Sequence, residues 1–174
     1  MKGSGVLMCC VVLLASPAFA DTIWDESVDG DISTDPLAPT QMTLVSSADR
    51  VSATIGGSST NSPPEDFYDT FTFTVPPGNQ VTAVVLADYQ VSGGNTSTGF
   101  NFYTGNQGEG GTFVGSVSMT TADIGSDLLT LSSVPAPLAP GDYSISMREG
   151  TAGQIYQLEI QGDVPVELQS FSVE

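Results

Sequence analysis

Alternation of apolar and polar side chains is the feature of this sequence that most restricts its fold. In DTFTFTV, Phe71, Phe73 and Val75 alternate with threonines. This pattern predicts a strand with one buried face and one solvent-exposed, β-branched face. Residues 76–79 (PPGN) then predict a turn, and residues 80–91 (QVTAVVLADYQV) predict a second long strand. We therefore expect these two strands to pair as a hairpin.

The same strand period recurs elsewhere, and no window of a dozen residues after position 20 shows a helical stripe. The further strand candidates are 41–45, 50–56, 99–105, 112–119, 127–133, 142–149 and 154–161. Glycine, proline, asparagine and serine separate them, a spacing typical of a β-sandwich or jelly roll. The sequence therefore predicts an all-β fold, an antiparallel β-sandwich or jelly roll of about nine strands.

The first twenty residues have the parts of a cleavable export signal. Lys2 precedes an apolar stretch, and Ala18-Phe19-Ala20 forms a small-x-small cleavage site. The apolar stretch is about ten residues long, whereas roughly 20 are needed to cross a bilayer, so no membrane span is expected in the mature protein. Both cysteines lie inside this segment, which leaves no disulfide or thiolate metal site to the mature chain.

Four segments of the chain follow from these patterns. We expect a signal peptide at 1–20, an acidic leader at 21–40, a β-sandwich domain at 41–161, and a tail or last edge strand at 162–174. The sandwich segment has the size of one ordinary domain, large enough to bury its own core.

Acidic residues far outnumber basic ones. The sequence holds 20 Asp and Glu residues against three Lys and Arg residues, a formal net charge of -17, and Arg50 and Arg148 are the only basic residues after position 20. Binding to nucleic acid depends on clustered Lys and Arg, so nucleic acid is excluded as a partner. An acidic surface instead favours solubility and cation binding.

The residues that most enzymes use for acid–base and nucleophilic chemistry are missing. The sequence has no His, and no Cys or Lys follows position 20, which removes the usual bases and nucleophiles. A carboxylate pair of the glycosidase type would remain, but the Glu residues are scattered along the chain. We expect a protein that is not an enzyme, with a carboxylate-pair glycosidase as the alternative.

Two groups of motifs carry a resemblance to a known family. An acidic pair precedes the Phe-x-Phe-x-Val strand and its following glycine, and a Leu-x-x-Gly-x-Tyr motif comes some sixty residues later. The residues concerned are Asp66, Asp69, Phe71, Phe73, Val75, Gly78, Leu138, Gly141 and Tyr143. Over roughly residues 65–161, the chain resembles the pre-peptidase C-terminal (PPC) class of bacterial secreted β-sandwich domains.

The N-terminal segment carries a second resemblance. Residues 24–40 (WDESVDGDISTDPLAPT) are similar to the mature N-terminus of small exported bacterial proteins that carry a Pro-Glu-Pro C-terminal sorting signal. Residues 162–174 depart from that group, because no apolar span and no terminal Arg cluster follow.

These resemblances imply a bacterial protein that is secreted, periplasmic or at the cell surface. The function they imply is a non-catalytic binding or surface/matrix module, with an extracellular carbohydrate or protein as its ligand. An accessory folding or targeting domain for secreted hydrolases is the alternative.

The acidic leader raises the question of a metal site. Asp29, Asp31 and Asp35 lack the glycine and the terminal bidentate Glu of an EF-hand loop, so that motif is excluded. Some collagen-binding relatives of the PPC class clamp calcium between an acidic N-terminal segment and a later Asp-x-x-Asp. By this resemblance, the candidate calcium ligands are Asp25, Glu26, Asp29, Asp31, Asp66 and Asp69.

Other interpretations of these residues remain open. The leader could be solvated and disordered, with Asp66 and Asp69 capping a turn or increasing solubility. Trp24 could plug the edge of the sandwich or stack against a sugar. Phe100 and Phe102 share one parity and are expected in the core, whereas Tyr103 is expected on the opposite face, where a carbohydrate could meet it.

Overall fold

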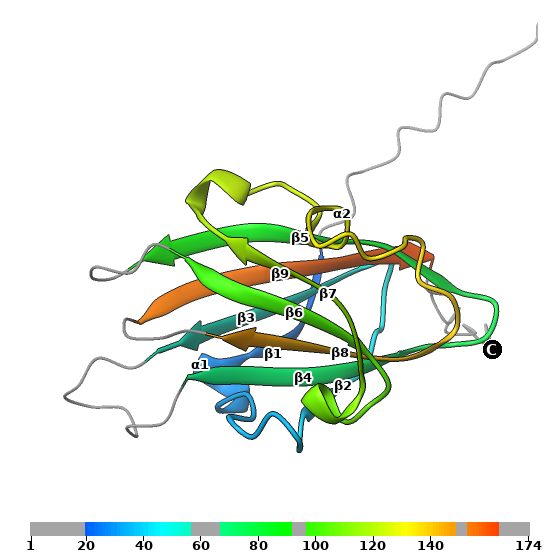
Figure 1. Ribbon diagram of the computed structural model, residues 1–174, viewed down its shortest axis with the longest axis horizontal. Coiled ribbons are helices and arrows are strands. Elements are labelled where there is room, and N and C mark those ends of the chain that lie inside the picture. The colour runs from blue at the N-terminus through cyan, green and yellow to red at the C-terminus, as the bar shows by residue number, and fades with distance from the viewer. Residues whose placement is uncertain (1–19, 57–66, 92–96, 149–152, 164–174) are drawn as a thin grey trace, which may run out of the picture.

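The computed structural model describes residues 20–56, 67–91, 97–148 and 153–163, and these form two β-sheets packed face to face (Figure 1). Sheet A contains, in spatial order, β1 (Asp21–Asp25), β3 (Ala48–Ile55), β9 (Gln154–Asp163) and β5 (Gln80–Val91). Sheet B contains β2 (Thr40–Met42), β4 (Tyr68–Val75), β8 (Gly141–Arg148), β6 (Thr98–Thr104) and β7 (Thr112–Met119).

The predicted all-β sandwich is confirmed, with nine strands among the described residues. Pairing is antiparallel between β3, β9 and β5 and between β4, β8, β6 and β7. The strands β1 and β2 instead join β3 and β4 in parallel. The sheets are therefore mixed, and the parallel pairs are those that begin in or just after the leader.

The core lies between the sheets and follows the predicted inward parity. The solvent-exposed face predicted for the threonines is wrong at Thr70 and Thr72, which are buried where the leader packs against Thr70. Phe71, Phe73 and Val75 are buried, and so are Phe100 and Phe102 on β6. Each side chain of this kind stabilises the fold by about 1.5–3 kcal/mol relative to an exposed position. Tyr143 on β8 stacks on Phe102 with ring centroids 5.6 Å apart.

The hairpin predicted for 70–75 and 80–91 is wrong. The turn is present, since Asn79 N donates to Pro76 O over 3.1 Å. However, β4 pairs with β2 and β8, whereas β5 pairs with β9. The turn therefore carries the chain from sheet B to sheet A. Pro76 and Pro77 have no N–H to donate to a ladder, which disfavours continued pairing beside the turn.

The strand predicted for 127–133 is also wrong. Residues Leu128–Leu131 form the short helix α2, and Asp127 caps its N-terminus by accepting hydrogen bonds from Leu129 N and Thr130 N. The Asp127 carboxylate also accepts from Val84 N over 3.1 Å, which fastens this segment to the free edge of β5. A capping interaction thus decides the structure of a segment whose apolar pattern suggested a strand.

The other helices are equally short: α1 (Glu26–Asp29), η1 (Gly108–Gly110) and η2 (Thr121–Asp123). Nowhere in the described residues does a helix reach the length and apolar character needed to cross a bilayer. The predicted signal peptide, except for Ala20, lies outside the described residues, as do Asp66 and the part of the predicted tail beyond Asp163.

Candidate metal centre

The leader runs from one sheet to the other. It begins as β1 at the edge of sheet A, turns through α1, and reaches sheet B where Thr70 N donates to Ser33 O over 2.9 Å. It then enters β2 at the edge of sheet B. Ile32, in the middle of this crossing, is 1% exposed and belongs to the core. The leader is therefore an ordered part of the sandwich and contributes an edge strand to each layer.

Two of the predicted ligands shape the turn at α1. Asp25 is the N-cap, and its carboxylate accepts from Ser27 N over 3.0 Å and from Ser27 Oγ over 2.6 Å. These hydrogen bonds lower the pKa of Asp25 below its ordinary value. Asp29 Oδ2 accepts from Asp25 N over 2.8 Å. Both carboxylates thus serve the local conformation of α1.

Trp24 completes this turn. Its Nε1 donates to Gly30 O over 3.1 Å, and its ring packs against the core. Gly30 ends α1 with a φ of 92°, a left-handed conformation that glycine adopts without steric cost. The indole therefore lies over the edge of the sandwich and beside the acidic turn, the position of an edge plug.

Glu26 points from α1 into the junction between leader and sheet. Its Oε1 accepts from Ile32 N over 3.0 Å, and its Oε2 accepts from Thr54 N on β3 over 2.6 Å. Both carboxylate oxygens of Glu26 therefore accept a backbone hydrogen bond. Hydrogen bonds of this kind hold a carboxylate in one orientation, as they do for metal ligands.

Three acids from different parts of the chain converge here. Glu26, Asp31 and Asp69 each offer a carboxylate oxygen, and the three oxygens lie within 4.8 Å of one another. Glu26 is half-buried, Asp31 is exposed, and Asp69 on β4 is fully buried on the core-facing side of sheet B. Three like charges at this spacing repel each other strongly. A bound cation would replace this repulsion with attraction between the ion and each carboxylate.

The structure thus groups three of the six predicted ligands. Glu26 and Asp31 come from the leader and Asp69 from the strand entry, the two segments from which ligands were expected. Asp25 and Asp29 lie outside the converging group, and Asp66 lies outside the described residues. Three carboxylates can supply up to six oxygens, with backbone carbonyls and water completing the six to eight that calcium takes.

A second buried acid, Asp49, was not singled out from the sequence. Its carboxylate accepts from Val45 N and from Ser46 N, each over 3.1 Å, and from Ser46 Oγ. Burial raises the pKa of Asp49, although these hydrogen bonds oppose the shift. The signal was available, because Asp49 shares the inward parity of Val51, Ala53 and Ile55 on β3.

Sequence comparisons add no relative from which a ligand could be transferred. No protein-family model matches this chain, and no curated protein matches it.

Proposed function

We propose that this chain is a non-catalytic, exported β-sandwich module that binds an extracellular ligand, and that a calcium ion fastens its leader to both sheets. The observation that carries the calcium part is the convergence of Glu26, Asp31 and Asp69 within 4.8 Å at the crossing of the leader. The ion would join α1, the segment after it and β4 at one point. Its role is structural, because it would hold the two layers of the sandwich together.

The donor set supports calcium over other common ions. Hard carboxylate oxygens suit calcium and magnesium, whereas zinc and copper sites draw on His and Cys. The sequence has no His, and its two Cys lie at positions 9 and 10. Magnesium demands near-ideal octahedral geometry and keeps several waters, so a partly buried site with a fully buried carboxylate favours calcium.

The non-catalytic part of the proposal is supported by the placement of the acids. A glycosidase needs two carboxylates about 5–9.5 Å apart on either side of a substrate. Glu26, Asp31 and Asp69 instead converge at one point, and Glu26 accepts hydrogen bonds from two backbone N–H groups. A PPC-like module, as the sequence resemblance implies, would use such a site for stability.

The first test is a thermal melt of the purified protein in EDTA and then in increasing calcium. The midpoint should rise with free calcium, since a ligand at 100 times its Kd stabilises the folded state by about 2.7 kcal/mol. Terbium should show luminescence excited through Trp24, because the indole packs beside the acidic turn. Magnesium chloride and sodium chloride at matched ionic strength should raise the midpoint much less.

Asp31→Asn is the most informative variant, since the Asp31 side chain is exposed and its loss leaves the core intact. It should raise the midpoint in EDTA by relieving repulsion, and it should abolish most of the calcium-dependent rise. Asp163→Asn, an equal charge change at the exposed end of β9, is the matched control and should keep that rise. Equal calcium responses in wild type and Asp31→Asn would refute the site.

A further inference from the structure

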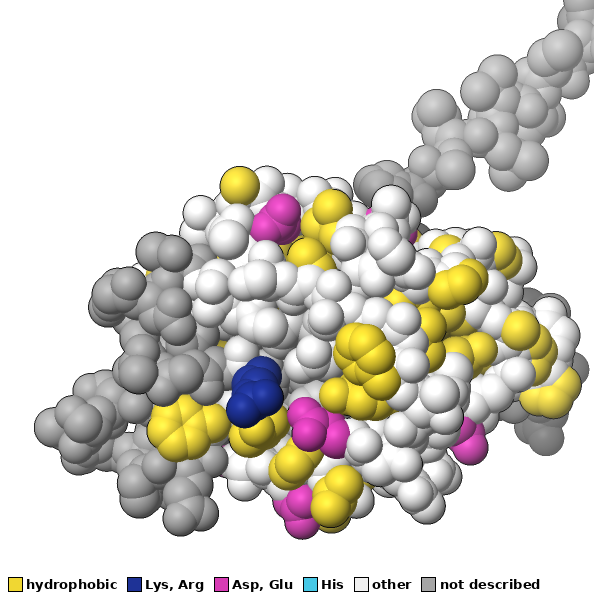
Figure 2. All heavy atoms as spheres, viewed as in Figure 1, with side chains coloured by type: hydrophobic (Ala, Val, Ile, Leu, Met, Phe, Trp, Pro, Cys, Tyr) yellow, Lys and Arg dark blue, Asp and Glu magenta, His cyan; other side chains and the backbone are white. Residues whose placement is uncertain are grey.

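The register of sheet B brings several aromatic and polar side chains together on its outer face. Tyr68 on β4 pairs with Arg148 on β8, which pairs with Gly99 on β6. Asn101 and Tyr103 follow Gly99 on the same face, because Phe100 and Phe102 face the core. Figure 2, viewed from the side of sheet B, shows a basic side chain with hydrophobic and acidic side chains beside it on this surface.

Arg148 is the basic residue of this face. Its guanidinium carbon lies 5.3 Å from the centroid of the Tyr68 ring, a cation–π contact that holds the side chain in place. Gly99 on β6, which pairs with Arg148, has no side chain to cover it. Among the described residues Arg148 has no ion-pair partner within 4.0 Å. Its side chain is exposed, so its N–H groups can donate to a ligand.

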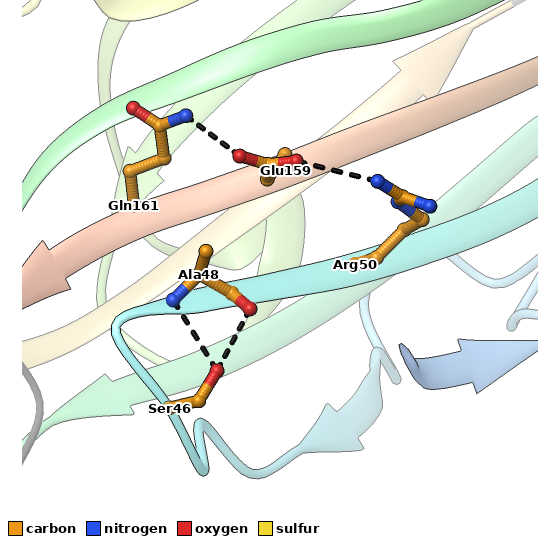
Figure 3. A network of polar contacts seen from close by, with 5 residues as sticks. All are labelled: Ser46, Ala48, Arg50, Glu159 and Gln161. Carbon is orange, nitrogen blue, oxygen red and sulfur yellow. Dashed lines mark hydrogen bonds and ion pairs between the residues drawn. The ribbon is translucent and has the colours of Figure 1, made fainter. Parts of the chain in front are cut away.

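Arg50, on sheet A, provides the contrast. Its Nη2 lies 3.4 Å from Glu159 Oε2, and Glu159 Oε1 accepts from Gln161 Nε2 over 2.7 Å. Figure 3 shows this network along β3 and β9, where Arg50 and Gln161 reach the same carboxylate from either side. One basic side chain of the described chain thus neutralises a neighbouring acid, and the other, Arg148, stacks on an aromatic ring.

Tyr103 and Phe113 form the aromatic part of the face. Their rings meet edge to face with centroids 5.7 Å apart, and a register shift between Phe102 and Tyr103 brings Phe113 opposite Tyr103. Phe113 is 56% exposed, so much of its ring is open to a ligand, whereas the Tyr103 ring, which was expected to be exposed, is largely buried at 8%. Burial raises the pKa of Tyr103, the charge of Glu109 raises it further, and Arg148 opposes the shift. The charges of Glu109 and Arg148 thus act on Tyr103 in opposite directions.

Glu109 is held beside Tyr103 by η1, which folds back onto sheet B. Glu109 N donates to Pro36 O over 2.7 Å, and Gly108 N donates to Ser144 Oγ over 3.1 Å. A Cβ on Gly108 would lie 2.2 Å from Pro36 O, so only glycine permits this close approach. The loop is therefore fixed, and the Glu109 carboxylate has a defined place next to the aromatic pair.

These side chains offer a mixture of hydrogen-bonding groups. Arg148 donates, the Glu109 carboxylate and the Asn101 side-chain carbonyl accept, and the Tyr68 and Tyr103 hydroxyls do both. Within the described residues neither tyrosine hydroxyl makes a hydrogen bond. A neutral sugar presents hydroxyls that both donate and accept, together with an apolar C–H face that stacks on an exposed ring such as Phe113.

We propose that the outer face of sheet B, at Tyr68, Asn101, Tyr103, Glu109, Phe113 and Arg148, binds a neutral hexose-based glycan. We call these six residues the sheet B site. The proposal rests on the binding role proposed above and is independent of the calcium ion. A polyanionic glycan is disfavoured because Glu109 lies within the site and the whole chain carries a net charge of -17.

The test presents calcium-loaded protein with neutral hexasaccharides (cellohexaose, laminarihexaose, maltohexaose), oligogalacturonate and a gelatin peptide, by isothermal titration calorimetry. At least one neutral oligosaccharide should bind, with a Kd between micromolar and millimolar. Phe113→Ala should weaken that binding by roughly tenfold or more, and Tyr103→Phe and Arg148→Gln by several-fold. Absence of neutral-glycan binding, or a preference for oligogalacturonate or peptide, would overturn the proposal.

Matched variants separate the site from general effects. Gly99→Val should block binding without removing a polar group, since a Cβ there meets Arg148 O at 3.5 Å without a clash. Ile155→Ala and Arg50→Gln remove an exposed apolar and a basic side chain from sheet A, and they should leave binding unchanged. Unchanged affinity in Phe113→Ala and Gly99→Val, with melting midpoints like those of the controls, would refute the sheet B site.

The same samples distinguish this proposal from the calcium clamp. A protein that calcium stabilises but that binds no neutral glycan would overturn the sheet B site alone. Glycan binding without a calcium response would support the sheet B site and overturn the clamp.

Discussion

Two aspartates, Asp49 and Asp69, point into the sandwich from its opposite ends, and both are fully buried. A buried carboxylate is costly unless hydrogen bonds or a cation compensate it. At Asp49 the compensation comes from the loop before β3, through Val45 N, Ser46 N and Ser46 Oγ. At Asp69 the neighbours include two more acids, Glu26 and Asp31. The first aspartate therefore closes a loop, and the second belongs to the converging acidic group.

Asp49 gives a prediction about pH. Its raised pKa means that the folded state binds the proton more tightly than the unfolded state. Its contribution to stability is therefore full below the ordinary Asp pKa of about 3.9 and is lost as pH rises through the raised pKa. Asp49→Asn lacks this loss, so its free energy of unfolding relative to wild type should improve as pH rises above about 4.

Urea unfolding at a series of pH values measures this difference. Asp163→Asn, an exposed residue on β9, is the control and should follow wild type more closely across the same range. Parallel stability curves for Asp49→Asn and wild type would contradict the assigned cause. Calcium is kept in excess throughout, so that titration of the proposed ion ligands contributes equally to each variant.

The sequence predicted which segments form the candidate site, but it did not predict which acids in them cap the turn and which converge. The leader offers four neighbouring acids of similar chemistry. Asp25 and Asp29 hold the turn of α1, whereas Glu26 and Asp31 converge on Asp69. That division depends on the direction in which α1 leaves β1, which is a property of tertiary packing. An Asp-x-Ser pattern at 25–27 was the local signal for a cap.

At the scale of elements, the strand period predicted where strands lie better than how they pair. Alternation indicates which side chains of a strand face the core, but it does not indicate the partner strand. Both β4 and β5 direct apolar side chains to the core, although they belong to different sheets. The turn at 76–79 is compatible with a hairpin or with a crossing between layers. The partner strands are distant in sequence. β5 pairs with β9 from Gln80 to Val91, and β4 pairs with β8 along its full length.

Two glycines test this arrangement. Gly162 on β9 lies against β5, and a Cβ there would approach Gln80 O to 2.2 Å. Gly162→Ala should therefore destabilise the protein by about 1–3 kcal/mol, through overpacking between the two strands. Gly78, in the turn between β4 and β5, has a φ of 85° and open space around it. Gly78→Ala should cost about 1–2 kcal/mol, from backbone strain alone.

Denaturant unfolding would show Gly162→Ala as the more destabilised of the two, with a larger change in amide exchange along β5. A hairpin between β4 and β5 would make the turn glycine the more sensitive position. A larger loss for Gly78→Ala would therefore count against the observed pairing of β5 with β9.

At the scale of the whole molecule, the leader joins the two layers. It covers the edge of β3 with β1 and the edge of β4 with β2, and Ser33 meets Thr70 between them. A single segment thus supplies one edge strand to each sheet. The acidic group lies at the crossing, where charge repulsion would loosen both edges together.

Amide hydrogen exchange should resolve this coupling. In calcium, exchange should slow at Ile32 N and Thr54 N, which donate to Glu26, and at Thr70 N, which donates to Ser33. The effect can reach roughly a hundredfold at free calcium 100 times Kd, if opening of the leader releases the ion. Val45 N and Ser46 N, bonded to Asp49 at the other end, should change much less.

Glu26→Gln should remove this calcium effect, because one ligand charge is lost. Its amide can accept from only one of the two backbone N–H groups, so exchange is compared with and without calcium within the variant. Asp163→Asn should preserve it. Calcium should slow amide exchange at the leader contacts more than in the loop bonded to Asp49, because a locally bound ion stabilises the segment that it contacts. Uniform slowing along the described strands, or equal slowing by sodium chloride at matched ionic strength, would instead indicate screening of the net charge and would reject the clamp.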